Sequence, residues 1–292
     1  MRFGKVLLCS AVVFAAAGLI SAPARSADLP TKALAMTGCA QAVDGLNGKL
    51  AGYGGSLENK GLYGGSGSLA LPLACEFGAQ VDGSGASFDS RFLGTVAGHL
   101  FWRNPAKGLL GIYGSYTSWD QAGGVHASHI GGEGEYYFGQ WTLQGVAGIE
   151  SGNNTSAVIG GLTQTYDVKT RFFDQVNLAY YLQDNFKVYV GHRYLYGQNA
   201  LAAGGEWGLP MSHGIMAALF VEGRVGEHDD HGIWGGLRVY FGQKDKTLIR
   251  RHREDDPADW NDGFGISNTG STPPAGCPPN FHPFNGGCLP ND

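Results

Sequence analysis

Two residues near the middle of the chain have the types that nucleophilic hydrolysis needs. His126 and Ser128 are two positions apart, so their side chains share one face if this segment is a β-strand. An imidazole beside a serine hydroxyl can act as the base that activates it. No carboxylate that would orient the histidine is identifiable, and Ile130 continues the same face. The pair therefore supports only an alternative function, and the simpler interpretation is a polar rim above an apolar strand face.

A second set of chemically capable residues lies in a predicted surface loop. Carboxylates and imidazoles together offer oxygen and nitrogen ligands to a divalent cation. Acidic hairpin loops are usually only solvated, so the loop is a weak metal candidate. We expect neither a metal nor another cofactor. The candidate ligands are His228, Asp229, Asp230 and His231, preceded by Glu227.

The elements that would position these residues are β-strands. Between about residues 45 and 242, apolar residues recur at every second position, which is typical of half-exposed strands. Near the end of this region, one face carries Ile233 and Leu237, and the opposite face carries Trp234 and Arg238. Counting such segments predicts about 12 antiparallel strands.

The composition excludes several classes of protein. Glycine accounts for 49 of 292 residues and aromatic residues for 12%, whereas charged residues account for only 15%. An ordinary soluble protein has roughly 25% charged residues. No internal stretch of the sequence reaches the roughly 18 apolar residues of a membrane-spanning helix. The net charge of −5 gives no electrostatic basis for binding nucleic acid.

The chemistry of the two strand faces distinguishes a membrane barrel from a soluble sandwich. A soluble β-sandwich would bury the apolar face in a dry core, whereas a membrane barrel turns it toward lipid. The other face carries Gly, Ser, Gln and Tyr with scattered charges of both signs, which can pair in a narrow lumen. We therefore expect an all-β fold, a single antiparallel up-and-down transmembrane β-barrel, with the sandwich as the alternative. The expected lumen-lining residues are Glu76, Gln80, Asp82, Lys187, Arg193, Glu222, Arg224 and Arg238.

The connections between the predicted strands also favour the barrel. Short turns alternate with longer polar connections, as expected when short turns are periplasmic and longer loops are external. Aromatic residues gather at the short turns, as in the girdle that a barrel places at the membrane interface. The short turns are at 103–107, 138–141 and 183–185, and the longer connections are at 150–163, 197–204 and 226–231.

The N-terminus has the layout of a secretory signal peptide. Arg2 and Lys5 precede an apolar stretch of secretory length and a segment of small residues. We expect cleavage after Ser26, or after Ala24. The tail beyond the barrel is expected to be mostly irregular, either as a solvated linker or as a tether to peptidoglycan or another periplasmic protein. The predicted organisation is a signal peptide at 1–26, a periplasmic N-terminal segment at 27–44, the barrel at 45–242 and a periplasmic tail at 243–292.

Export to an oxidising compartment predicts disulfides among the four cysteines that remain after cleavage. Proximity in sequence favours Cys277 with Cys288 and Cys39 with Cys75, although three pairings are possible. The four cysteines lack the paired C-x-x-C spacing of a zinc site.

Two short motifs resemble those of small, porin-like outer-membrane β-barrel proteins of alphaproteobacteria. One is Ala-Asp-Leu-Pro at 27–30, directly after the cleavage site. The other is the segment 236–241, a glycine followed by alternating apolar residues, which resembles the signal read by the barrel-assembly machinery. In this chain Trp234 stands where that signal has a polar residue, and Phe241 is not the terminal residue. The resemblance implies the outer membrane of a Gram-negative cell, with its lipids, lipopolysaccharide and the assembly machinery as partners.

The function expected from these features is structural, or that of a narrow passive channel for small solutes, rather than enzymatic. Charges of both signs without a one-sided ring argue against strong ion selectivity. A lumen closed by its own side chains or by residues 27–44 also fits a barrel of this size. The alternative rests on His126-x-Ser128, which is similar to the motif of outer-membrane lipid A deacylases and implies a lipid-modifying hydrolase.

Overall fold

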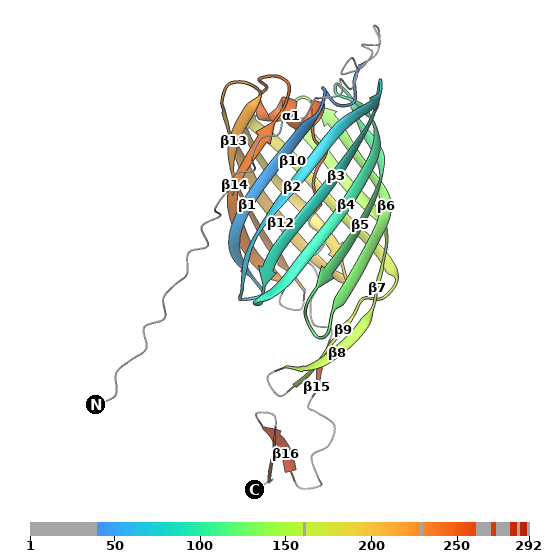
Figure 1. The fold of residues 1–292 in the computed structure, drawn as a ribbon, viewed down its shortest axis with the longest axis vertical. Coiled ribbons are helices and arrows are strands. Elements are labelled where there is room, and N and C mark those ends of the chain that lie inside the picture. The colour runs from blue at the N-terminus through green and yellow to red at the C-terminus, as the bar shows by residue number, and fades with distance from the viewer. Residues whose placement is uncertain are drawn as a thin grey trace, which may run out of the picture. The chain divides into compact units, whose positions relative to one another are not determined.

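The chain folds into a closed antiparallel β-barrel (Figure 1). The computed structural model describes residues 40–159, 162–227 and 230–260, and the backbone of 270–272, 281–284 and 287–290. Pairing of β1 with β14 closes the sheet, which confirms the predicted fold and excludes a two-sheet sandwich. The wall strands are β1 (Asn47–Leu57), β2 (Lys60–Ala74), β3 (Phe77–Phe88), β4 (Arg91–Asn104), β5 (Gly108–Trp119), β6 (Val125–Phe138), β7 (Trp141–Gly152), β10 (Arg171–Gln183), β11 (Phe186–Leu195), β12 (Gln198–Pro210), β13 (Ile215–Gly226) and β14 (His231–Phe241).

The alternation of residue types sorts side chains between the outside and the inside of this barrel. On β14, Ile233 and Leu237 are exposed on the outer surface, whereas Trp234 and Tyr240 are buried inside. Other wall strands follow the same rule, with Leu110 and Ile130 among the exposed outward side chains. Because strand side chains alternate strictly, one apolar face per strand produces a continuous apolar outer surface.

The two ends of the barrel differ. We call the end where the chain enters β1 and leaves β14 the near end, and the opposite end the far end. The expected short turns at 103–107, 138–141 and 183–185 all lie at the near end. The far end carries a two-stranded hairpin, β8 (Asn154–Ile159) and β9 (Leu162–Asp167), between β7 and β10.

The expected long connection at 197–204 is wrong, because these residues belong mainly to β12. Tyr196 and Gly197 both have positive φ, 53° and 78°, and form a tight turn between β11 and β12. A left-handed residue pair reverses a chain in two residues, and the right-handed twist of the flanking strands favours it. The small and polar residues after Gly197 then pair with β11, and from Ala200 onward also with β13.

Aromatic and aliphatic side chains fill the far end of the barrel interior. Trp119 is 1% exposed and stacks on Phe88, with ring centroids 5.1 Å apart. Tyr166 of β9 meets the same indole edge-on at 5.4 Å. The far end is therefore a packed core, which the β8–β9 hairpin helps to cover.

The tail does not stay apart from the barrel as a solvated linker would. A helix α1 (Leu248–Glu254) follows β14, and both Leu248 and Trp260 are buried. Further on, β15 (Gly270–Thr272) pairs with β9, and β16 (Phe281–Phe284) pairs with β17 (Gly287–Pro290). The first part of the tail is thus an internal component of the barrel.

Several predictions concern residues for which the structure gives no description. Residues 1–39, which include the expected signal peptide and Cys39, lie outside the described residues. Cys277 also lies outside them, and only the backbone of Cys288 is described. Cys75 lies in the turn between β2 and β3. The disulfides therefore stay predictions. In the described part of the chain, no helix is long and apolar enough to cross a membrane.

Candidate functional site

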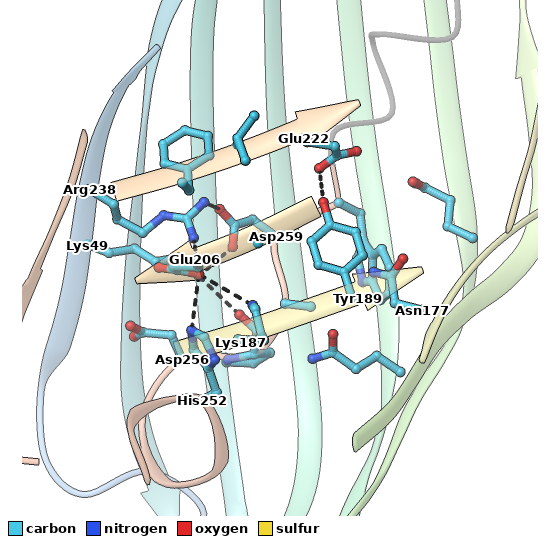
Figure 2. Close-up of a pocket in the computed structure, with 18 of the residues that line it drawn as sticks. Lys49, Asn177, Lys187, Tyr189, Glu206, Glu222, Arg238, His252, Asp256 and Asp259 are labelled. Atoms are coloured by element: carbon cyan, nitrogen blue, oxygen red, sulfur yellow. Dashed lines mark hydrogen bonds and ion pairs between the residues drawn. The ribbon is translucent and has the colours of Figure 1, made fainter. Parts of the chain in front are cut away.

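A polar cavity lies inside the barrel between the inner faces of β10–β14 and the first part of the tail (Figure 2). Its volume is about 100 Å³. Its wall side is lined by charged side chains from paired neighbouring strands, and its other side by residues 252 and 256–260. The tail is thus part of the site.

Glu206 is the centre of a buried charge network in this cavity. Its carboxylate lies 3.0 Å from Nη1 of Arg238 and 3.3 Å from Nζ of Lys187, and it accepts a 2.6 Å hydrogen bond from the Tyr240 hydroxyl. Lys187 directly faces Glu206 in the register between β11 and β12. Only 3% of Glu206 is exposed. Such charge-assisted bonds are strong, and the loss of one partner of a buried pair leaves the other charge uncompensated.

The tail supplies further countercharge to the same cluster. Asp259 lies 2.5 Å from Nζ of Lys49 and 3.7 Å from Nη2 of Arg238. Lys49 also donates to the carbonyl oxygen of Pro257 at 3.1 Å, and Figure 2 shows the carboxyl groups of Asp256 and Asp259 among these cations. Without the tail, the wall side of this cavity would carry more cations than carboxylates, namely Lys49, Lys187, Arg193, Arg224 and Arg238 against Glu206 and Glu222. The tail therefore supplies negative charge to a part of the inner wall that is otherwise positive.

Helix α1 holds the tail against the near end. His252 lies between two tyrosine hydroxyls, with Nδ1 2.8 Å from Tyr181 and Nε2 2.9 Å from Tyr240. The backbone N–H of Leu248 donates to Oδ1 of Asn185 at 2.9 Å, and Arg253 donates to the carbonyl oxygen of Trp141 at 2.8 Å. These contacts fix the helix to the near-end turns after β6 and β10.

A buried lysine joins this helix to the start of the barrel. Nζ of Lys246 lies 2.5 Å from Asp255, 3.1 Å from Asp44 and 3.2 Å from Glu254. Burial alone would lower the pKa of Lys246, but the charge of Asp255 and the hydrogen bonds to Asp255 and Asp44 raise it above its usual value. The lysine therefore stays charged and ties the N-terminal and C-terminal ends of the barrel together.

A second charged cluster lies on the inner faces of β3, β4 and β6, and its Asp82 lines a smaller cavity together with Asp259 and Trp260 of the tail. His99 places Nε2 2.9 Å from Asp82 and Nδ1 2.8 Å from Glu133. At a further site, Glu150 lies 3.2 Å from Arg171 and 3.4 Å from His129. The cluster around His99 joins β3, β4 and β6, whereas the cluster around Glu150 joins β6, β7 and β10. They stabilise the wall rather than line the cavity.

The expected lumen-lining residues face inward with one exception. Glu76 lies in the turn between β2 and β3, where it accepts a 2.8 Å hydrogen bond from the Trp102 indole. The alternation of side chains does not continue into the turn, so the side chain of Glu76 does not lie on the inner face. The side chains on the inner wall are Gln80, Asp82, Lys187, Arg193, Glu222, Arg224 and Arg238, of which Lys187, Arg193, Glu222, Arg224 and Arg238 line the cavity.

Sequence reasoning missed Lys49, Glu206 and the clusters around His99 and Glu150. The alternation of side chains along each strand could have identified these wall residues as inward-facing, because His99 shares a strand face with the buried Phe101 and Arg103. The role of the tail had no such signal, since Asp259 is separated from Lys49 by most of the chain.

His126 and Ser128 lie on the outer face of β6 near the far end. Nδ1 of His126 is 2.9 Å from the hydroxyl of Tyr116, and the two rings stack at 5.8 Å. Ile130, on the same face, is 72% exposed. The histidine thus bonds a neighbouring tyrosine, and the geometry does not support the hydrolase alternative.

The expected metal loop is only partly described. His228 and Asp229 lie outside the described residues, whereas Asp230 pairs with Arg224 at 2.9 Å. Burial raises the pKa of Asp230 despite this partner. His231 begins β14. The described part of the chain contains no group of three or more His, Cys, Asp or Glu side chains placed to hold a metal ion.

Comparison with known proteins adds information on the fold. No protein-family model and no curated protein matches the sequence. A membrane protein solved in work on in-meso crystallization is 13% identical, with a TM-score of 0.52 over 76% of this chain and 97% of that one. The translocator domain of the autotransporter NalP from Neisseria meningitidis is 15% identical (TM-score 0.44; 68% and 88% covered), and the KdgM porin 7% identical (TM-score 0.41; 66% and 98% covered). At such identities the likeness is one of fold, that of a closed antiparallel β-barrel.

Proposed function

We propose that the protein is an outer-membrane β-barrel with a structural role, whose lumen is closed by its own C-terminal segment. The single observation that carries the closure is the position of the tail inside the barrel, where Asp259 pairs with Lys49 and Trp260 is buried. With these residues in place, the interior is packed at the far end, charge-paired toward the near end and covered by α1 at the near end.

The apolar outer surface supports the membrane location. Val81, Leu110, Ile112 and Ile130 are each more than 60% exposed on the outside of the wall. A soluble monomer rarely leaves a large continuous apolar surface in water. A closed barrel also satisfies its backbone hydrogen bonds internally, as lipid requires. Outer-membrane lipids and lipopolysaccharide are the partners that we propose for this surface.

A row of aromatic rings supports the position of the near-end interface. Tyr136, Phe138, Trp141 and Tyr180 follow one another on the outside of β6, β7 and β10, with successive centroids 5.5, 6.3 and 4.5 Å apart. Amphipathic rings favour the boundary between headgroups and hydrocarbon. The near end, with its short turns, is therefore proposed as the periplasmic end.

Charge favours a second candidate function, the passage of small anionic solutes when the tail is displaced. Lys49, Lys187 and Arg238 would then outnumber Glu206 on the exposed inner wall. Rings and clusters of Lys and Arg select anions in pores. In this state the protein would be the narrow channel expected from the sequence.

Bilayer conductance tests both candidates. The full-length protein and a chain truncated after Thr247 are compared after each has shown the heat-dependent gel shift of a folded barrel. We expect the full-length protein to give no steady conductance and the truncated chain to conduct with anion preference. Steady conductance of the full-length protein would refute closure. A folded but silent truncated chain would show that wall side chains alone close the lumen.

A further inference from the structure

We propose that the tail threads the barrel, so that its strands β15, β16 and β17 are delivered to the far end and presented on the cell surface. This inference rests on the proposed function for the identity of the two membrane faces. The threading itself follows from three described parts of the tail and from the length of chain between them.

The tail begins at the near end. β14 ends at Phe241, and α1 lies over the near-end turns, where the N–H of Ile249 donates to the carbonyl oxygen of Asp184 at 2.9 Å. Figure 1 shows α1 at the end of the barrel opposite to the β8–β9 hairpin. The chain therefore approaches the lumen from the proposed periplasmic side.

The next described residues lead into the lumen. Asp259 is held by Lys49 and Arg238, both on the inner wall. Trp260 is 6% exposed and belongs to the same buried cluster as Trp119 and Tyr166 of the far end. Successive residues of the tail thus contact first the near-end turns, then charged side chains of the inner wall close to that end, and then a buried cluster that extends to the far end.

The chain is next described beyond the far end. Gly270 pairs with Thr165, and Thr272 pairs with Thr163, both on β9. β9 belongs to the hairpin that connects β7 to β10 at the far end. Strand β15 therefore lies on the opposite side of the barrel from the end of β14.

Chain length decides the route between these points. From Trp260 to Gly270 the chain spans at most about 36 Å. Strands of this length, tilted by roughly 40°, make a wall about 30 Å tall. A path back through the near end and around the outside adds the depth of Trp260 and the wall thickness, and needs roughly 50 Å. The sheet is closed, so no lateral exit exists. The far opening is the route that fits.

The charge pairing explains how an acidic segment is held in the lumen. Asp259 bonds Lys49 on the near-end side of the lumen, while Trp260 packs into the buried cluster that extends to the far end. The barrel would then act as the carrier of a C-terminal surface segment that includes β16 and β17.

Epitope accessibility on intact cells tests this topology. Three full-length proteins carry one tag each: after Asp292, between Lys169 and Thr170 at the far end, or between Ala106 and Lys107 at the near end. Each is probed by antibody before and after outer-membrane permeabilisation. We expect the tags at 292 and 169 to be accessible on intact cells and the tag at 106 only after permeabilisation.

The pattern of the three tags separates the two proposals. A tag at 292 that behaves like the tag at 106 would overturn threading and leave the barrel orientation intact. Tags at 292 and 169 that both need permeabilisation, with 106 accessible, would support threading and refute the proposed orientation. Tags found only in soluble periplasm would refute the membrane barrel and surface presentation together.

A charge reversal supplies a second readout. Lys49→Asp places a carboxylate against Asp259, whereas Lys60→Asp, the matched control, changes a partly exposed lysine at the far end. We expect at least a five-fold loss of surface signal from the tag at 292 for K49D and little change for K60D. Equal surface signal in both variants, with heat shifts intact, would contradict the proposed path past Lys49.

Discussion

Replacing Glu206 by glutamine removes the negative charge at the centre of the buried charge network in the lumen. The carboxylate is 3% exposed and contacts Arg238 at 3.0 Å and Lys187 at 3.3 Å. An amide of the same shape preserves packing but leaves both cations with too little countercharge. Removing one partner from a buried ion pair costs about 3–5 kcal/mol. We therefore expect Glu206→Gln to lower the free energy of unfolding by about 3 kcal/mol or more.

Urea unfolding in lipid vesicles, followed by tryptophan fluorescence, measures this loss. The matched control is Asp167→Asn, which breaks a pair with Lys169, 69% exposed at the far end. An exposed pair contributes about 0–1 kcal/mol. A loss below about 1 kcal/mol for E206Q, equal to that of the control, would refute a cooperative charge network in the lumen.

Three further predictions follow from the described contacts. Trp260→Ala removes a large side chain from the buried cluster of the lumen and should cost about 3–5 kcal/mol in the same unfolding assay, whereas an unchanged value would place this indole outside the barrel. Burial raises the pKa of Glu58, which lies in the turn after β1, to about 7, although the positive charge of Lys60 lowers it. A raised carboxyl pKa favours the folded state at low pH, so stability should fall as pH rises from 5 to 8 in the wild type and less in Glu58→Gln; identical pH profiles would contradict this. Ser128→Ala should leave the lipid A and phospholipid composition of cells unchanged, and an altered lipid profile would revive the hydrolase alternative.

The wall of the barrel was predictable because it depends on a local pattern. The period of two separated Leu237 from Arg238 correctly, and it needed no knowledge of which strands pair. β12 escaped this pattern, since the small residues after Gly197 look like a loop until β11 and β13 pair with them on both sides. Glu76 was wrongly expected in the lumen for the opposite reason, because the alternation was extended into a turn, where it no longer holds.

The site itself was predictable only in part. Lys187 and Arg238 were expected in the lumen from their strand faces. Their partner Asp259 was not, because residues 255–260 have no periodicity and look like an acidic, solvated linker. Its role depends on Lys49, at the other end of the sequence, and on closure of β1 against β14. Long-range charge pairing of this kind leaves no mark in either segment alone.

Hydrogen exchange of the tail tests the central claim most directly. In lipid nanodiscs, the amides of residues 248–260 are compared by mass spectrometry with those of the wall strand β12 and with the same peptide free in solution. A segment held inside a closed barrel should exchange at least a hundred-fold more slowly than the free peptide. Exchange at the rate of the free peptide would mean that the tail is a solvated linker and that the lumen is not closed by it.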